Sequence, residues 1–291
     1  MSNEHEEYQY LNLVKECIEK GVYKQNRTGI GTYGFFGRMM RYSLKDYTLP
    51  LLTTKTTAYR VILEELLFFI KGKTDNKLLK QKKINIWTGN STKEFYEKYN
   101  INREEDDLGP VYGFQWNHFN APYVNCKTDY TGKGVNQLQN AIDIIKKDPT
   151  SRRMVIVAWN PEQLREMALP PCHCLFQFYV ADNKLSCLLY QRSGDMGLGV
   201  PFNIASYSLL ALMVAKVTGL EPGEFIHSLG DVHLYENHIE PIKKQLERTP
   251  YPFPKIKFKK EKYDSIYDFE FDDFILENYE SHPTIKMDMA V

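Results

Sequence analysis

The clearest candidate for chemistry in this sequence is a thiol. Cys172 follows two rigid prolines, Pro170 and Pro171. A nucleophilic cysteine needs a held backbone, partial access to solvent and nearby positive charge, because the thiolate is the attacking form. A lone cysteine is more often a small buried apolar residue, which is the role we expect for Cys174 and Cys187 inside strands. The surroundings of Cys172 must therefore decide its role.

The expected chain path places an arginine beside this thiol. The runs 173–181 and 184–190 have the composition of strands, and Asp182-Asn183 between them is a hairpin signal. The second strand would end beside the start of the first, which brings Arg192 next to Cys172. Its guanidinium would stabilise a thiolate and could also bind an anionic substrate.

Three further arginines could hold a phosphate. Arg152 and Arg153 precede an apolar strand, and Arg27 lies in a loop. Paired guanidinium groups bind phosphate oxygens in a fork geometry. A charge pair at a strand end is, however, most often only solvated, so both readings stay open.

Two polar residues flank an apolar helix expected at 203–218. Asp195 lies in the glycine-rich run 193–199, where backbone can approach a ligand closely, or it is a solvated turn residue. Asn203 opens the helix, where Asn is a common N-cap. Its amide could instead pair with both N3–H and O4 of a uracil ring.

Two carboxylates sit in a hydrophobic helix expected at 57–71. Glu64 is expected to face water, whereas Glu65 could lie on the apolar side. A carboxyl held there has a raised pKa and can act through water as an acid or base. The alternative, that both side chains are exposed, has equal weight.

The elements that must position these residues mix strands and helices without strict alternation. Further strands are expected at 33–43 and 153–159, and a further helix at 136–147. This pattern predicts an α+β fold with a central sheet in a single domain over 1–291. The polar runs 89–109, with a short helix, and 118–134 are expected to be exposed loops.

Composition narrows the class of partner. The chain has 291 residues, with 37 Lys+Arg against 37 Asp+Glu, so no global field favours nucleic acid or membranes. The longest apolar run, 209–215, is too short to span a bilayer. The odd number of cysteines and the polar N-terminus favour reduced thiols in the cytoplasm, and a nuclear fraction stays open.

Two motifs are expected to be decoys. Gly29–Gly34 spells G-x-G-x-x-G, but strand-like residues follow it where a dinucleotide site needs a helix. Cys172-His173-Cys174 lacks the second ligand cluster that zinc needs, so no metal is expected.

The ordered motifs resemble the thymidylate synthase family over nearly the whole chain, closest to its eukaryotic, monofunctional members. They are Arg27-Thr28-Gly29, Leu52-Thr53-Thr54-Lys55, 108–113, Ser151-Arg152-Arg153, Pro171-Cys172-His173, Tyr190-Gln191-Arg192-Ser193, 201–207, 230–235 and Met289-Ala290-Val291. The resemblance implies a methyltransferase that converts dUMP to dTMP, with 5,10-methylenetetrahydrofolate as one-carbon and hydride donor and dihydrofolate as product.

The resemblance also implies which residues form the site. The implied catalytic residues are Cys172, Glu65, Tyr112, His173, Asp195 and Asn203. The implied dUMP-binding residues are Arg27, Arg152, Arg153, Gln191, Arg192, Ser193, Gly194, Asp195, Asn203, His233 and Tyr235. The implied folate-binding residues are Ile86, Trp87, Asn90, Asp195, Leu198, Gly199, Phe202, Tyr235 and Ala290.

Within this resemblance Cys172 adds to C6 of the pyrimidine, which splits one hard step into easier ones. Asn203 selects uracil, Glu65 manages protons at O4 and the folate, and Tyr112 assists loss of the C5 proton. Asp195 binds the pterin, and the C-terminal tail closes over the bound pair.

The implied architecture is a bent mixed sheet covered by helices, with two sheets packed back to back in a homodimer. Arg152 and Arg153 reach the other subunit's site in that arrangement. Five positions depart from the family pattern, mostly on the expected folate side: Thr56, Ala58, Thr88, Asn117 and Cys174. Two alternatives stay open, a hydroxymethylase acting on dUMP or dCMP and a protein that binds RNA.

Overall fold

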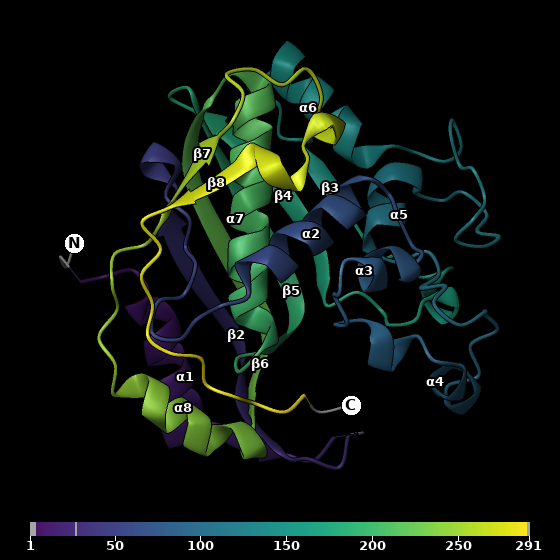
Figure 1. Cartoon of the computed structure of the whole chain (residues 1–291). Helices are drawn as coiled ribbons and strands as arrows, with labels where there is room; N and C mark the ends of the chain where they lie inside the picture. The colour runs from purple at the N-terminus through teal and green to yellow at the C-terminus, as the bar shows by residue number, and fades with distance from the viewer. Residues whose placement is uncertain (1–3, 27, 290–291) are drawn as a thin grey trace.

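Six strands form one mixed sheet in the computed structural model, which describes residues 4–26 and 28–289 (Figure 1). The strands are β1 (Val22–Lys24), β2 (Thr32–Ser43), β3 (Val155–Val157), β4 (His173–Ala181), β5 (Lys184–Asp195) and β6 (Glu221–Tyr235). Their order is β1-β2-β6-β5-β4-β3, and only β5 and β6 run parallel. A separate hairpin pairs β7 (Lys255–Phe258) with β8 (Phe274–Glu277). The predicted α+β class with a mixed sheet is confirmed.

Helices cover one face of this sheet. They are α1 (Tyr8–Lys20), α2 (Tyr59–Ile70), α3 (Lys77–Gln81), α4 (Lys93–Lys98), α5 (Tyr112–His118), α6 (Gln137–Lys147), α7 (Gly199–Thr218) and α8 (Ile239–Leu246). Figure 1 shows α7 lying along the sheet and α2 crossing over α7. Helices α3, α4 and α5 are grouped to one side. Among the described residues, α7 alone is long and apolar enough to cross a membrane, but it is mostly buried inside the fold.

The boundaries of two elements differ from the sequence prediction and move two candidate residues. Helix α7 begins four residues before Asn203, because Pro201 fits its first turn. Asn203 therefore lies inside the helix, and its expected place at the N-cap is wrong. Strand β5 continues to Asp195, so this aspartate ends a strand and does not lie in a glycine-rich turn.

The longest strand was not predicted. Strand β6 spans 15 residues and contains Pro222, two glycines and several polar side chains, which weaken the period-2 signal in the sequence. Its alternation is nevertheless clear in the structure, where Phe225, His227 and Leu229 are buried beneath the helices. Strand β6, which pairs with both β2 and β5, therefore contains many polar residues.

The run 89–109 is only partly the exposed insertion that we predicted. Helix α4 is the expected short helix, and Lys93 is exposed. Asp106, however, is buried and accepts hydrogen bonds from the side chains of Asn76 and Ser91. This polar run packs against α3 through buried hydrogen bonds.

Strand direction explains why the candidate residues meet at one end of the sheet. The parallel strands β5 and β6 both end there, at Asp195 and Tyr235. Strand β4 is antiparallel to β5 and therefore begins at the same end, immediately after Cys172. Helix α7, which connects β5 to β6, starts there at Gly199.

Candidate active site

Cys172 and Arg192 lie together as the hairpin predicted. Nη2 of Arg192 is 3.7 Å from Sγ of Cys172, and the Arg192 N–H donates to the Cys172 carbonyl at 2.8 Å. The same guanidinium donates to the carbonyls of Pro171 and Pro170 at 2.7 and 3.0 Å and lies over the Trp159 ring. Cys172 is half-buried. The thiol therefore has a fixed backbone, partial access and a cation beside it, which are the conditions for a reactive cysteine.

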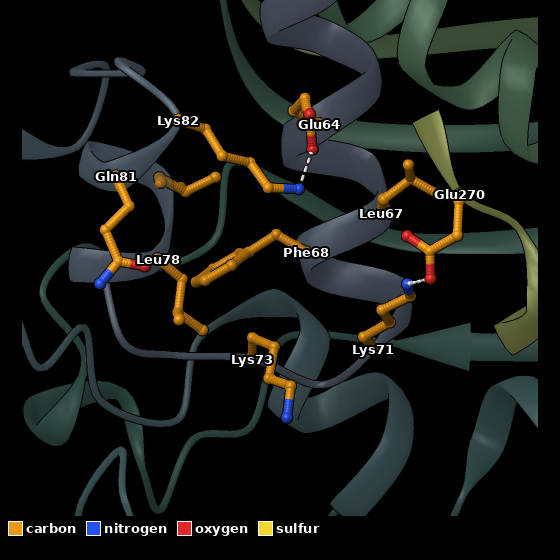
Figure 2. Close-up of a pocket in the computed structure, with 10 residues that line it drawn as sticks. Glu64, Leu67, Phe68, Lys71, Lys73, Leu78, Gln81, Lys82 and Glu270 are labelled. Carbon is orange, nitrogen blue, oxygen red and sulfur yellow. Dashed lines mark hydrogen bonds and ion pairs between the residues drawn. The ribbon is translucent and has the colours of Figure 1, made fainter. Parts of the chain in front are cut away.

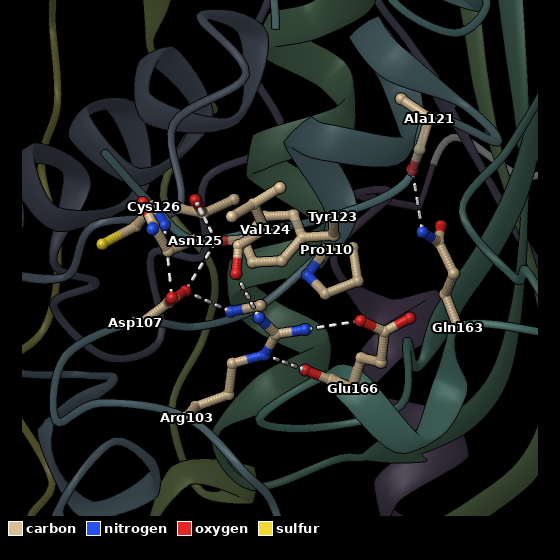
Figure 3. Close-up of polar contacts among 12 residues, drawn as sticks. Arg103, Asp107, Pro110, Ala121, Tyr123, Val124, Asn125, Cys126, Gln163 and Glu166 are labelled. Atoms are coloured by element: carbon tan, nitrogen blue, oxygen red, sulfur yellow. Dashed lines mark hydrogen bonds and ion pairs between the residues drawn. The ribbon is translucent and has the colours of Figure 1, made fainter. Parts of the chain in front are cut away.

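A polar network braces the loop that leads to the thiol. Arg103 forms an ion pair with Glu166 at 2.5 Å, donates to the Val124 carbonyl and lies over the Tyr123 ring (Figure 3). Tyr123 in turn donates to the buried carboxylate of Asp107. Glu166 lies six residues before Cys172, so this network limits how far the loop can shift.

The backbone of the thiol is held from α5 by a stacked pair of rings. The Cys172 N–H donates to the Tyr112 hydroxyl at 2.9 Å. The Tyr112 ring stacks on His173 with centroids 3.8 Å apart, and Nδ1 of His173 is 2.6 Å from the Tyr207 hydroxyl. Burial raises the pKa of Tyr112 well above its ordinary value and lowers the pKa of His173 to about 3. Both predicted catalytic residues are thus neutral. Tyr112 holds the backbone of the thiol, and His173 supports the Tyr112 ring.

The two neighbouring carboxylates of α2, Glu64 and Glu65, have different surroundings. Glu64 is buried and pairs with Lys82 in a cavity of about 290 Å³ between α2 and α3 (Figure 2), so its expected exposure is wrong. Glu65 is half-buried and accepts a hydrogen bond from Trp87 Nε1 at 2.8 Å. Burial raises the pKa of Glu65 to about 7, and the Trp87 hydrogen bond opposes this rise. A carboxyl that titrates near neutral pH is suited to proton transfer.

The start of α7 brings Asp195 and Asn203 together. A Cβ placed on Gly199 would lie 3.8 Å from Cβ of Asp195 and 4.0 Å from Oδ1 of Asn203. Asp195 accepts the Gly197 N–H at 2.9 Å, and both polar side chains are half-buried. They are therefore accessible to a ligand at this end of the sheet.

The ends of β5 and β6 supply the next group of predicted residues. Asp195 pairs with His233 and Ser193 with Asp231 in the parallel register. His233 lies 3.0 Å from Asp231, whose pKa is lowered by this hydrogen bond, and its ring lies 5.4 Å from that of Tyr235. These side chains line the same end of the sheet as the thiol. Gly194 and Gln191 are buried beneath them.

Arg152 and Arg153 are not brought to this site. The residue that follows them, Met154, accepts a hydrogen bond from the N–H of Phe178 in β4. Phe178 lies six residues beyond Cys172, roughly 20 Å away along an extended strand. Both guanidinium groups are exposed, and neither has an ion pair or side-chain hydrogen bond within the part of the chain that the structure describes.

The predicted folate side is apolar and partly open. Ile86, Leu198 and Phe202 are half-buried, whereas Trp87 and Asn90 are buried, and Trp87 contacts Glu65. Arg27 and Ala290 lie outside the described residues. Within those residues, no group of three or more His, Cys, Asp or Glu side chains could hold a metal ion.

The departures from the family pattern lie in different environments. Asn117 is buried, donates to the Phe69 and Ile70 carbonyls at the end of α2 and accepts from the Tyr267 hydroxyl, so its expected place on the folate side is wrong. Thr56 and Ala58 are exposed before α2, and Thr56 donates to the His282 carbonyl.

Sequence reasoning missed three buried polar residues next to the site. Lys55 donates to the Gly197 carbonyl at 2.6 Å, and burial lowers its pKa to about 8. His238 binds the Asp288 carbonyl of the C-terminal segment at 2.8 Å. His227 contacts Gln191 at 2.8 Å. Each contact joins residues far apart in sequence, so no local signal could have identified it.

Comparisons with known proteins agree with this geometry. A family model described as thymidylate synthase matches residues 8–291. The chain is 56% identical over 288 residues to a thymidylate synthase of Homo sapiens, covering 99% of this chain and 91% of that one. It is 54% identical over 287 residues to thymidylate synthase 1/2 of Encephalitozoon cuniculi, covering 98% of each. It is 51% identical over 292 residues to a bifunctional dihydrofolate reductase-thymidylate synthase of Paramecium tetraurelia, covering 100% of this chain and 63% of that one.

Proposed function

The chain belongs to the thymidylate synthase family, and from this premise we propose how its residues carry out the reaction. It is a methyltransferase that converts dUMP to dTMP with a folate co-substrate. The observation that carries the mechanism is the half-buried Cys172 thiol, held 3.7 Å from the Arg192 guanidinium. 5,10-Methylenetetrahydrofolate supplies the one-carbon unit and the hydride.

Cys172 is the nucleophile. Arg192 stabilises its thiolate, which adds to C6 of the pyrimidine and makes C5 reactive toward the one-carbon unit. Negative charge then develops on O4 of the ring. The amide of Asn203 and the carboxyl of Glu65 are placed to stabilise it, and a group that titrates near pH 7 can deliver and remove protons there. Tyr112, whose hydroxyl holds the Cys172 N–H, keeps the sulfur in line with C6.

The nucleotide and the folate are held by different parts of the same sheet end. His233 and Tyr235 bind the sugar, and Arg192 and Ser193 bind the phosphate. The apolar side chains of Ile86, Leu198 and Phe202 suit the flat rings of a folate, and the half-open carboxylate of Asp195 suits the pterin nitrogens. These residues therefore fit both substrates.

A homodimer completes the phosphate site. Arg152 and Arg153 lie roughly 20 Å from Cys172 of their own chain, by the strand rise, and are free of ion pairs among the described residues. They can therefore serve a phosphate only in a second subunit. Paired guanidinium groups would give that phosphate its bidentate clamp.

The uncovered face of the sheet supports the same assembly. Four large apolar side chains of β2, β3 and β4 are exposed, with Phe36 81%, Met39 57%, Val155 39% and Tyr179 63% accessible. The residues on the other face of these strands, such as Phe176 and Phe178, are buried under the helices. Exposed large apolar side chains suit an interface, and a second sheet packed on this one would cover them.

One experiment tests nucleophile, substrate and co-substrate together. The protein is incubated with 5-fluoro-dUMP and methylenetetrahydrofolate, and the intact mass and the peptide masses are measured. A ternary covalent adduct on Cys172 is expected, because fluorine at C5 blocks the later loss of a proton. No adduct with folded protein, or an adduct on another residue, would contradict the mechanism. With dUMP itself, a hydroxymethylated product would show a hydroxymethylase instead.

We also place the protein in the cytoplasm. Cys17, Cys174 and Cys187 are buried thiols outside any disulfide, as suits a reducing compartment. Fractionation of cells with an antibody to the chain tests this, and recovery in a membrane or secreted fraction would contradict it.

A further inference from the structure

A buried chain of hydrogen bonds joins Ser193, Gln191 and His227, next to Arg192. Nε2 of Gln191 donates to the Ser193 carbonyl at 2.9 Å. Oε1 of Gln191 lies 2.8 Å from Nε2 of His227, which projects from the neighbouring strand β6. Gln191 is 2% exposed and His227 is fully buried, so no water competes for these bonds.

The chemistry of these groups fixes every proton in the chain. A carbonyl oxygen only accepts, so the NH₂ group of Gln191 must face Ser193 and its oxygen must face His227. An amide oxygen also only accepts, so Nε2 of His227 must carry the proton. Burial lowers the pKa of His227 to about 3, and the ring is therefore neutral at working pH.

His227 is not explained by packing alone. Its second nitrogen, Nδ1, is buried without a hydrogen-bond partner among the described residues. An unsatisfied buried acceptor destabilises the folded state, and an apolar side chain at this position would avoid that cost. The only hydrogen bond that the structure gives this side chain is the one to Gln191.

Gln191 is close enough to the thiol for its amide orientation to matter. It pairs with His173 across β4 and β5, and Arg192 follows it. A Cβ placed on Gly194 would be 3.8 Å from Nε2 of Gln191. The amide nitrogen therefore lies beside the 193–195 segment, which ends at Asp195 in the site. If the amide turned over, its oxygen would face the Ser193 carbonyl, and the site would be offered an acceptor in place of a donor.

We propose that His227 is a positioning residue, which holds the Gln191 amide so that its second N–H is presented to the bound nucleotide. The inference deepens the proposed function, since Gln191 is a nucleotide-binding residue only if that function is correct. His227 itself touches no substrate and transfers no proton.

The first test removes the donor and then restores it. His227→Phe keeps a flat ring and loses the N–H, so kcat/KM for dUMP should fall about 10-fold to 100-fold, as for loss of a buried hydrogen bond. His227→Gln carries an N–H and should recover most of that loss. The rate at which iodoacetamide alkylates Cys172 should be unchanged in both, because Arg192 still holds the thiol. The pH profile of kcat/KM in His227→Gln should also keep its shape, and a lost limb would instead show acid-base chemistry at His227.

The second test asks whether the effect passes through Gln191. In a Gln191→Met background, which has no amide, adding His227→Phe should lower kcat/KM no further. Ser208→Ala is the matched control, since Ser208 is fully buried on α7 and its hydroxyl has no partner among the described residues. It should leave kcat/KM unchanged while any loss of thermal stability is measured. An equal loss in both Gln191 backgrounds, or a loss that only follows melting temperature, would overturn the proposal.

The outcomes separate this inference from the proposed function. If the wild-type chain makes no dTMP, the function fails first. If it makes dTMP and the two substitutions act independently, only the positioning role fails. Should His227→Phe not fold, the cycle is run with His227→Gln, whose more mobile donor should still lower kcat/KM slightly, and only when Gln191 is present.

Discussion

Two sets of arginines in the same sheet show how differently one side chain can be used. Arg192 is held by two carbonyls, a Trp ring and the thiol itself. Arg152 and Arg153, at the far end of β4, are exposed and have no ion pair within the described residues. The held guanidinium fixes a reactive atom, which must be rigid within one chain. The exposed pair is free to contact a group outside the chain, as the proposed homodimer requires.

This contrast divides the site into two parts. In the proposed function, the nucleophile, its cation and the proton-transferring carboxyl belong to one subunit. The phosphate site would be completed by Arg152 and Arg153 of a second copy. Substitutions in the first part should therefore change chemistry, and substitutions in the second should change binding and depend on the partner.

The largest effect should come from the thiol. Cys172→Ala should lower kcat by more than about 1000-fold, because no other group can form the covalent bond. dUMP binding, measured by calorimetry, should weaken by less than about threefold, since ring and phosphate contacts remain. Circular dichroism provides the folding control. Equal loss of turnover and binding would mean that Cys172 is structural.

Arg192→Lys tests whether the held arginine acts by charge or by geometry. Lysine keeps the charge but cannot bind both proline carbonyls and the thiol, so the loop would move. A shift of this kind should lower kcat about 100-fold. Arg153→Lys is the comparison, and it should mainly raise KM for dUMP. If Arg192→Lys retains nearly full kcat, then Arg192 does not act by fixing the position of the thiol.

Glu65 also belongs to the part of the site that lies within one chain, and burial controls the charge state of its carboxyl. Its pKa is about 7 in the folded chain and its ordinary value is 4.5. The unfolded chain binds fewer protons between these values, so stability should fall as pH rises from about 4.5 to 7 and then level off. Glu65→Gln should remove this dependence.

Urea unfolding at pH 5 and pH 8 measures the difference. Between these pH values, the free energy of unfolding of the wild type should fall by about 2 to 3 kcal/mol more than that of Glu65→Gln. A parallel pH dependence in the two proteins would mean that Glu65 has an ordinary pKa and is not suited to proton transfer at neutral pH.

Mixing two inactive variants tests whether Arg152 acts in the site of the second subunit. In a hybrid of Cys172→Ala and Arg152→Ala, one of the two sites keeps both groups. Random exchange makes about half of the dimers hybrid, so about one quarter of the wild-type activity should return. Subunit exchange is verified by mass spectrometry. No recovery despite exchange would show that Arg152 serves its own chain.

The smallest effect is expected at Thr56. Thr56 is exposed before α2 on the expected folate side, so Thr56→Lys should raise affinity for a polyglutamated folate by about threefold, as for one exposed ion pair. Affinity for the monoglutamate should not change. Competition binding measures both, and equal gains would point to a packing effect.

Local geometry explains which parts of the site were predictable. Arg192 comes close to Cys172 because a two-residue hairpin pairs the strands that lie between them in the sequence. A register shift between His173 and Leu175 then brings Arg192 opposite Cys172. The meeting of Asp195 with His233 could not be predicted in this way. It depends on the parallel pairing of β5 with the polar strand β6, and on α7 between them.

The errors also have physical causes. Periodicity placed Glu64 and Glu65 on a helix but could not show that Lys82, which follows α3, pairs with the buried Glu64. The helix expected at 203–218 would place Asn203 at its start, but α7 begins at Gly199 and includes Pro201. A proline is tolerated in the first turn of a helix, and the helix therefore begins earlier.

The assembly of the site from three distant stretches has a consequence for how the chain folds. The Cys172 loop, the end of β5 and the end of β6 meet only after the crossover through α7 has closed, and such non-local pairing is slow to form. Early compact intermediates can contain much of the helix but no working catalytic centre. Recovery of turnover during renaturation would therefore report the last event of folding, later than any spectroscopic signal from the helices.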